Sequence, residues 1–392
     1  MHKIGEKILT WIDPKLIEGP ALEQLHNVAE LPFLAGPLAA MPDVHKGYGA
    51  TIGSVIPTTG AIVPMAVGYD KGCGMIAVRT KFFANQLPDN LQSIHDGIER
   101  RIPVSAGGYH REVPKSAESL LAHLKKIALA EYDTIAPSWP RQLGTLGSGN
   151  HFIELCLDEN NQLWAVLHSG SRGIGHRLAD RHIKVAKRLM QEQGVALKDR
   201  DLAYLSEGTP EFHSYIYDLW WAQEFALLNR EHMMNQVMTE LSYSLCGEDG
   251  HQHEIELERI NCHHNFAQKE THFGKEMWIT RKGAIQMQAG QRGIVPGSMS
   301  SATYIVTGLG NPQSYCSAPH GAGRKLGRKE AERRFTVKDL EKSMEGIVCR
   351  VRKSLVDEGD YAYKDIDATM NASCDLMRVD HRLKQVLNIK GD

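Results

Sequence analysis

The stretch HFIELCLDENNQLWAVLHSGSRGIGH, residues 151–176, contains two short apolar runs that decide the expected fold. His151 to Leu155 and Leu163 to Leu167 are rich in residues that favour β-strands, and Gly or Asn lies close to their ends. Runs of the same kind recur along the chain. They are Ile62 to Val67, Met75 to Arg79, Met277 to Thr280 and Thr303 to Val306.

Segments with apolar residues at helical spacing lie between these strands. Strands come in clusters, and helices are inserted between clusters without regular alternation. This order predicts an α+β fold with mixed β-sheets surrounded by helices. Candidate site residues come from all along the chain, so residues 1–392 are predicted to form one domain. The expected helices are Leu87 to Arg101, Ala117 to Ala130, Arg177 to Gln193, Pro210 to about Ser242, and Val337 to Val356.

Composition excludes several classes of protein. No apolar run approaches the ~20 residues that span a bilayer, and the N-terminal MHKIGEKILTWIDPK lacks the features of a signal peptide. We therefore expect a cytoplasmic protein. The seven cysteines are scattered, which argues against a disulfide framework. The net charge of -2 argues against extensive non-specific binding of nucleic acid but says nothing about a local basic pocket.

The motifs MPDVHKGYG and GYDKGCG place polar side chains in loops dense with glycine. Asp70 and Cys73 are three residues apart around Gly72, so their carboxylate and thiolate could reach one metal ion. The alternative is that Asp70 caps a turn and Cys73 is a small buried hydrophobic residue.

Three further motifs carry histidines. His151 follows the Gly-rich loop of GTLGSGNHF, and His168 ends an apolar run in AVLHSGSRGIGH. Glycine-rich loops let backbone N–H groups approach an anion. In INCHHNF, neighbouring side chains of an extended chain point to opposite faces, so at most one of His263 and His264 is expected to bind a given metal.

The motif PHGAGR places His320 beside glycines and an arginine, which suits an imidazole that attacks phosphorus. An ordinary turn histidine is the alternative. The whole candidate set offers one carboxylate, one thiolate and three imidazoles. Such a mixed set favours a transition metal over magnesium or calcium, and a shared thiolate would permit two metal ions.

From Met41 to the C-terminus the chain resembles the RtcB family of RNA-splicing and RNA-repair ligases. The motifs that carry the resemblance are MPDVHKGYG, GYDKGCG, GTLGSGNHF, HSGSRGIGH, NCHHNFAQKE, PGSM, HGAGR and the terminal IKG. They occur in the family's order and at fitting intervals. The resemblance implies the family's own α+β fold, with a dinuclear metal site in a central cleft.

The resemblance also implies roles for individual residues. His320 matches the histidine that accepts GMP. The implied ligands of two Mn²⁺ ions are Asp70, Cys73 as the bridge, His151, His168 and His264. The implied GMP-binding residues, including two arginines that meet phosphate groups, are Asn150, His151, Phe152, Ile153, Glu154, Arg172, His264, Asn265, Pro296, Gly297, Ser298, Met299, Thr303, His320, Gly321, Ala322, Gly323, Arg324 and Lys390.

The implied activity is a GTP- and Mn²⁺-dependent RNA ligase. It would join 2′,3′-cyclic phosphate or 3′-phosphate ends to 5′-hydroxyl ends through a histidine–GMP intermediate, in tRNA splicing or RNA repair. The expected partners are GTP and fragments of tRNA or rRNA, with the protein acting as a monomer.

Two other functions remain open for the same site. One is a catalytically silent relative that binds RNA ends or nucleotides, and the other is a metal-dependent cyclic phosphodiesterase. The chain departs from the family pattern at Lys71, between two implied ligands, where an apolar residue is expected. This cation is expected to point to solvent, to tune the metal pair, or to meet an RNA phosphate.

Overall fold

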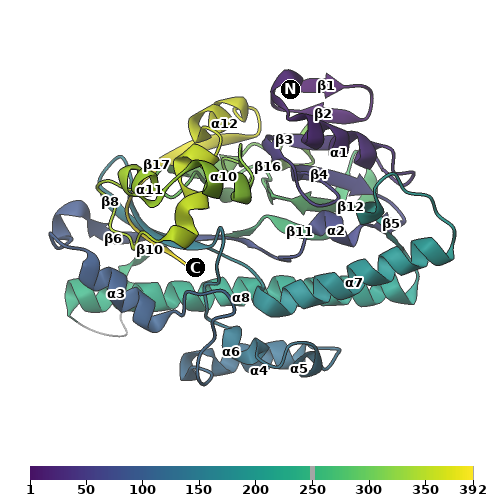
Figure 1. Ribbon diagram of the computed structural model, residues 1–392. Helices are drawn as coiled ribbons and strands as arrows, with labels where there is room; N and C mark the ends of the chain where they lie inside the picture. Colours follow the sequence, from purple (N-terminus) through teal and green to yellow (C-terminus); the bar gives the residue numbers. More distant parts are fainter. Residues whose placement is uncertain (248–251, 392) are drawn as a thin grey trace.

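The computed structural model describes residues 1–247 and 252–391, and two β-sheets form its centre (Figure 1). The six-stranded sheet has the order β1 (His2–Ile4), β2 (Ile8–Thr10), β3 (Leu38–His45), β4 (Ile52–Thr58), β12 (Lys275–Lys282), β11 (Asn265–His272). The seven-stranded sheet has the order β10 (Glu256–His263), β6 (Gly74–Phe83), β8 (Gln162–Ser169), β7 (Phe152–Leu157), β17 (Met377–Lys390), β15 (Thr303–Gly308), β14 (Arg292–Pro296).

The predicted α+β class is confirmed. The six-stranded sheet is mixed, because β2 and β3 are parallel while its other pairs are antiparallel. Every neighbouring pair of the seven-stranded sheet is antiparallel. Two small pairs complete the strands, namely β5 (Ala61–Ile62) with β9 (Leu205–Ser206) and β13 (Ala284–Gln286) with β16 (Ser317–Pro319).

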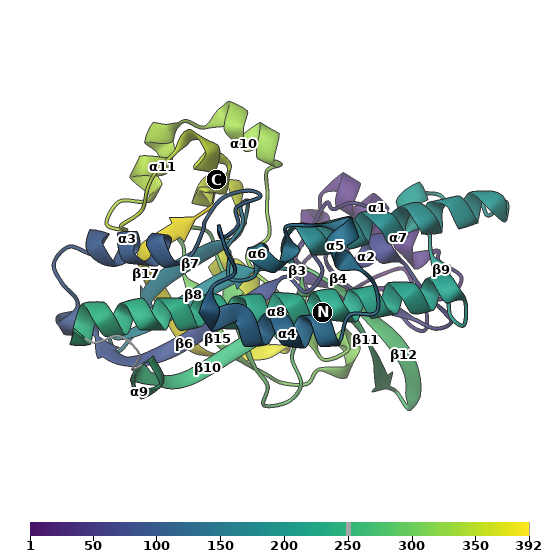
Figure 2. The ribbon, with the colours of Figure 1, turned by 90° about the horizontal axis from the view of Figure 1, so that it is seen from below.

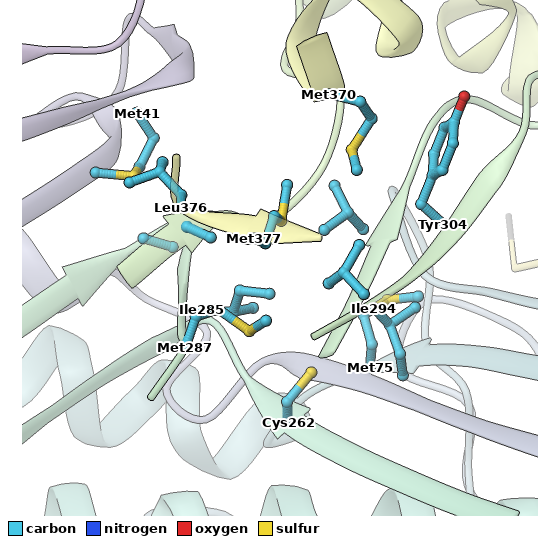
Figure 3. Close-up of a cluster of buried hydrophobic side chains, with 14 of the residues drawn as sticks. Met41, Met75, Cys262, Ile285, Met287, Ile294, Tyr304, Met370, Leu376 and Met377 are labelled. Carbon is cyan, nitrogen blue, oxygen red and sulfur yellow. The ribbon is translucent and has the colours of Figure 1, made fainter. Parts of the chain in front are cut away.

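Alternating side chains of the central strands supply two cores. On β6, Met75 and Ala77 pack between the sheets, whereas Ile76 and Val78 face the helices on the other side. This period of two is what an extended strand imposes when both faces are covered. Figure 3 shows part of the core between the sheets, with Met41 of β3 and Ile294 of β14 contributing to it.

Helices cover the outer faces of the sheets. The 37-residue α8 (Pro210–Cys246) runs the length of the molecule beneath the strands, with α3 (Gln92–Arg101) beside one end of it (Figures 1 and 2). Helix α1 (Gly19–Ala29) packs on the six-stranded sheet. The other helices are α2 (Pro64–Val67), α4 (Glu118–Lys126), α5 (Tyr132–Ile135), α6 (Trp139–Gln142), α7 (Arg172–Glu192), α9 (Gln252–Ile255), α10 (Arg328–Arg334), α11 (Val337–Ser343) and α12 (Ile366–Ala372).

Two element predictions depart most from the structure, while the other predicted helices differ from it only at their ends. The run from Ile62 to Val67 is mostly the short helix α2, because Pro64 lies at its first position, where its fixed φ suits a helix. The helix expected from Val337 to Val356 ends at Ser343. Gly346 then adopts a φ of +82°, and Val348 forms a parallel bridge with Leu387 of β17, which takes the chain back to the sheet.

All seven cysteines are free, as the scattered pattern predicted. In the described part of the chain, no helix is both long and apolar enough to cross a membrane.

Candidate active site

Four segments distant in sequence meet at one end of the seven-stranded sheet. Asp70 and Cys73 lie in the turn before β6, His151 precedes β7, His168 lies near the end of β8, and His264 lies between β10 and β11. Antiparallel pairing of β6, β7 and β8 brings these ends together. The turn requires glycine at position 72, since its φ is +69° and a Cβ there would lie 2.7 Å from the backbone of α8.

The five predicted ligands form two triads that share one thiol. Cys73 Sγ lies 3.2 Å from His168 Nε2 and 3.5 Å from His151 Nε2. The His151 Nε2 atom is 3.0 Å from Asp70 Oδ2, and the His168 and His264 Nε2 atoms are 2.9 Å apart. Within each triad, the candidate ligand atoms all lie within 4.8 Å of one another. Each triad could therefore hold a metal ion, and Cys73 belongs to both.

Backbone carbonyls select the nitrogen that two of the histidines present. His151 Nδ1 lies 2.9 Å from the carbonyl oxygen of Leu146, and His168 Nδ1 lies 2.9 Å from that of Asn150. A proton on Nδ1 donates to each carbonyl, which leaves the Nε2 lone pair free for a metal. Burial, and then the neighbouring His151, lower the pKa of His168 well below its ordinary value.

Asp70 and Cys73 differ in how readily they carry charge. Burial alone would raise the pKa of Asp70, but the hydrogen bond and charge of His151 outweigh it and hold this pKa well below its usual range. Ser171 donates to Asp70 Oδ1 from its backbone N–H, at 2.9 Å. Burial, followed by the Asp70 charge, raises the pKa of the Cys73 thiol. The thiol must therefore lose its proton when a metal binds. Oxygen, nitrogen and sulfur donors together fit a divalent transition metal.

A cavity of about 320 Å³ adjoins the histidine side of this cluster. His168 lies on its wall, so the metal centre opens into it. Most of the predicted nucleotide-binding residues line the cavity as well. Its lining comprises His45, Ile52, Asn150, Phe152, His168, Pro296, Gly297, Ser298, Met299, His320, Gly321, Ala322, Gly323, Arg324, Arg328, Glu358, Tyr363 and Lys390.

A buried carboxylate holds His320. Asp43 Oδ2 lies 2.7 Å from His320 Nδ1 and also accepts from the His320 backbone N–H at 3.2 Å. Asp43 is fully buried. With Nδ1 engaged, Nε2 is the nitrogen left for chemistry. Gly323 is needed here, because a Cβ at its φ of +75° would lie 2.2 Å from the Asp43 carbonyl oxygen. Asp43 was noticed in the MPDVHKGYG motif but was not predicted as a site residue.

The opposite wall of the cavity is built around Glu358, which the sequence did not single out. Its carboxylate accepts from Lys390 Nζ at 2.6 Å, from Tyr363 Oη at 2.7 Å and from Arg324 Nη1 at 3.2 Å. Arg328 also pairs with it. Burial would raise the pKa of Glu358, but Lys390 and then the two arginines lower it to about 2.

Several predicted nucleotide-binding residues lie outside the cavity lining. Glu154 is buried below it and accepts from Asn388 Nδ2 at 2.8 Å and Thr303 Oγ1 at 3.4 Å. Burial raises the pKa of Glu154 to about 8. Ile153 points to the other face of β7, into the core against the helices. The alternation of side chains along a strand imposes this direction on the Ile153 side chain, and it leaves the role of the Ile153 backbone open.

Two more of these residues support the loops around the metal centre. Asn265 donates to the backbone oxygen of Asp70 at 3.3 Å and accepts from the Gly283 N–H at 2.8 Å. Arg172 donates from Nε to Thr145 Oγ1 at 3.1 Å and adopts a φ of +58°. That conformation is unusual for a residue other than glycine and occurs at functional sites.

Lys71 points to neither solvent nor the cavity. It is fully buried, with Nζ 3.3 Å from Tyr215 Oη and 4.6 Å from the centre of that ring on α8. Burial lowers the pKa of Lys71 to about 7, partly opposed by Asp218. Of the three alternatives for Lys71, exposure to solvent was therefore wrong.

Comparison with known proteins agrees with this arrangement of motifs. A family model described as tRNA-splicing ligase RtcB matches residues 24–137 and 123–391. The RNA-splicing ligase RtcB of Escherichia coli K12 is 45% identical over 397 residues, covering 97% of this chain and 96% of that protein. The tRNA-splicing ligase RtcB of Pyrobaculum aerophilum is 30% identical over 430 residues, covering 92% and 88%.

Proposed function

The chain belongs to the RtcB family, and we propose on that basis that it is an RNA ligase that loads GMP from GTP onto His320 and joins broken RNA ends. The observation that carries the proposal is the position of His320. Asp43 holds one of its ring nitrogens, and the ring lies 4.7 Å from that of His264, at the edge of the metal centre. We also propose that the ligase domain spans the whole chain and acts as a cytoplasmic monomer.

Two Mn²⁺ ions are the proposed cofactors. Asp70, Cys73 and His151 would hold one ion, and Cys73, His168 and His264 the other. When bound, such ions neutralise phosphate charge and polarise phosphoryl oxygens. Manganese rather than zinc or iron follows from the family resemblance, and the donor set is compatible with it.

His320 is the proposed nucleophile toward GTP. Asp43 accepts a hydrogen bond from the N–H at Nδ1, so the Nε2 atom carries the lone pair that attacks the α-phosphorus. A P–N bond forms to GMP as the bond to the pyrophosphate oxygen breaks. Asp43 also stabilises the positive charge that develops on the ring during attack, as a carboxylate does for a catalytic imidazole.

The far wall of the cavity is suited to the rest of the nucleotide. Arg324 and Arg328 supply positive charge toward phosphate oxygens, while Glu358 pairs with both. The Pro296–Met299 turn and the Gly321–Gly323 loop line the same cavity. Glu154 and Lys390 are the polar groups proposed to select guanine.

RNA joining follows in two steps, transfer of GMP to the RNA 3′-phosphate and then attack by the 5′-hydroxyl. A terminal 3′-phosphate oxygen attacks the phosphorus of the His320 adduct, so the P–N bond breaks and an RNA–GMP anhydride forms. The 5′-hydroxyl of the second strand then attacks the RNA phosphorus, losing its proton, and GMP leaves. A 2′,3′-cyclic phosphate must first be opened by water to give the 3′-phosphate.

The test is incubation with α-labelled GTP and manganese, followed by a denaturing gel. The wild-type chain should retain label and His320→Ala should not. His381→Ala is the matched control, since His381 pairs with Glu159 on the exposed side of β17. Undiminished labelling of His320→Ala would refute the nucleophile.

Two alternative functions give different results in the same assay. A silent end-binding relative would bind RNA ends without retaining label. A cyclic phosphodiesterase would convert a 2′,3′-cyclic phosphate to a monophosphate without GTP and without label. His320, fixed beside the metal centre by Asp43, favours GMP transfer over both.

A further inference from the structure

The metal centre has a second open side that the nucleotide cavity does not use. His168 lines the cavity, whereas no atom of Asp70 does. Yet the Asp70 side chain is 33% exposed, while that of His151 next to it is only 7% exposed. Asp70 is thus the solvent-exposed member of its triad, and it lies outside the lining of the nucleotide cavity.

Aromatic rings flank this second approach. Tyr69 directly precedes Asp70, and its ring stacks on His176 with centroids 4.6 Å apart and planes 16° apart. Tyr48 meets Tyr69 edge-on at 6.5 Å and 84°. We call Tyr48, Tyr69 and His176 the aromatic cluster. His176 is exposed, and Tyr48 is 70% exposed, so rings of both can be reached by a ligand.

The aromatic cluster is fixed relative to the metal centre. His176 lies in the second turn of α7, and Ser171, immediately before that helix, donates to Asp70. Tyr48 is held through its backbone carbonyl, which accepts from the buried Lys282 Nζ. The same ammonium donates to the Met65 carbonyl at 3.1 Å. An exposed tyrosine on so well anchored a loop is already positioned for stacking.

Basic residues continue from the aromatic cluster along one face of α7. Arg177, Arg181, Lys184 and Arg188 are exposed and separated by four, three and four residues, which places them on one helix face. Asp180 pairs with Lys184 at 2.7 Å and Glu192 with Arg188 at 3.6 Å, so two of these four charges are partly neutralised. Cations beside stacking rings are the combination that tracks a single nucleic-acid strand.

We propose that the aromatic cluster stacks the terminal base of a single RNA strand whose end reaches the Asp70 side of the metal centre. This inference rests on the proposed RNA-ligase function and identifies a binding surface for that same site. Every base offers a π-face, so the contact would accept any terminal base. Such tolerance suits a ligase that joins RNA ends of different sequence.

The experiment measures whether removing one aromatic ring and removing the terminal base have coupled effects on RNA affinity. Metal-loaded full-length protein is titrated with fluorescent RNA oligonucleotides that carry either a single 3′-phosphate end or a single 5′-hydroxyl end of interest. Each is made with an ordinary or an abasic terminal nucleotide. Wild type is compared with Tyr48→Ala and His176→Ala, and with Tyr243→Ala as the control for loss of an exposed tyrosine on α8.

We expect about a tenfold loss of affinity for one of the two ends in Tyr48→Ala or His176→Ala. The abasic oligonucleotide should bind wild type and these variants equally, and Tyr243→Ala should behave as wild type. The end that shows coupling identifies which strand uses the aromatic cluster. Equal losses with ordinary and abasic ends, or no loss with either, would overturn the inference.

Labelling with GTP alone separates this inference from the proposed function. Tyr48→Ala and His176→Ala should label as fast as wild type, because GMP transfer to His320 needs no RNA. If wild type fails to label, the proposed function fails. If an alanine variant is misfolded, Tyr48→Phe and Tyr48→Leu decide the matter. Phe should retain affinity for the terminal base, and Leu should lose it, whereas equal binding by both would contradict stacking.

Discussion

The two sides of the candidate active site are held in different ways. The metal centre is built from side chains at strand ends, and backbone carbonyls of Leu146 and Asn150 orient two of its histidines. The opposite wall is built from long charged side chains that contact one another around Glu358. Strand register therefore sets the geometry of the metal centre, whereas charge balance sets that of the wall.

This difference has a consequence for binding. The Cys73 thiol must lose its proton before the two triads can receive their ions. The cations of the wall already have a partner, so a phosphate must compete with Glu358 for them. Substitutions in the metal centre should therefore act on metal content, and substitutions in the wall should act on stability and nucleotide affinity.

The largest effect is expected from Cys73→Ala. Cys73 belongs to both triads, so its loss should remove metal from both sites and reduce GMP labelling below detection. Metal content of the purified protein checks this directly. Cys156→Ala is the control, because Cys156 is equally buried on β7 but lies outside both triads. A metal-loaded, active Cys73→Ala protein would contradict a shared thiolate.

Asp43→Asn should come next. The amide cannot balance a developing imidazolium and can favour the wrong ring tautomer, which costs about 10²–10⁴-fold in comparable sites. The rate of GMP labelling should fall by that order while metal content stays unchanged. Asp375→Asn, which alters a carboxylate bonded to Trp11, serves as the control. Loss of metal together with labelling would show that Asp43 acts on the metal centre instead.

Sequence alone located the metal side better than the wall. The five candidate ligands lie in four Gly- or Asn-flanked motifs, so each was visible without knowledge of the fold. Asp43 and His320 are 277 residues apart, and only the folded chain pairs them. Glu358 ends a 3₁₀ helix, Lys353–Glu358, just beyond a segment that periodicity assigned to one α-helix. No local pattern distinguished it from a surface glutamate.

Strand spacing also limits what a motif can assign. The run Asn150 to Glu154 was taken as nucleotide-binding as a whole, yet alternation sends Ile153 to the opposite core and leaves Phe152 at the cavity. Lys71 illustrates the converse limit. A lysine in a polar loop is expected in water, but its turn packs on α8 and buries it against Tyr215.

Glu358→Gln tests the wall. Removing the charge leaves Lys390 without the buried carboxylate that it pairs with, whereas Arg324 keeps Asp357. Breaking a buried pair costs about 3–5 kcal/mol of unfolding free energy. Chemical denaturation should detect this loss, with metal content unchanged. Glu341→Gln on the exposed face of α11 is the control. Unchanged stability would mean that the wall is not held by charge balance.

The smallest expected effect is a change in stability with pH that comes from Glu154, a residue in neither the metal centre nor the wall. Its pKa is raised from 4.5 to about 8 by burial, so the folded protein keeps a proton that the unfolded chain releases. The contribution of this group is fully present below pH 4.5 and is lost as pH rises through about 8, with a slope of at most about 1.4 kcal/mol per pH unit. Glu154→Gln cannot titrate, so its stability relative to wild type should rise between pH 5 and 8.

Denaturation curves of both proteins across that range measure the difference. A constant difference would place the Glu154 carboxylate in its charged form throughout, paired with Lys390 and so part of the wall. A rising difference would show that Glu154 is protonated, and therefore a neutral hydrogen-bond donor, at pH 7. It would then be held neither by strand register, like the metal centre, nor by charge balance, like the wall. In that case Glu154 can donate to an acceptor of the nucleotide, which a carboxylate cannot do.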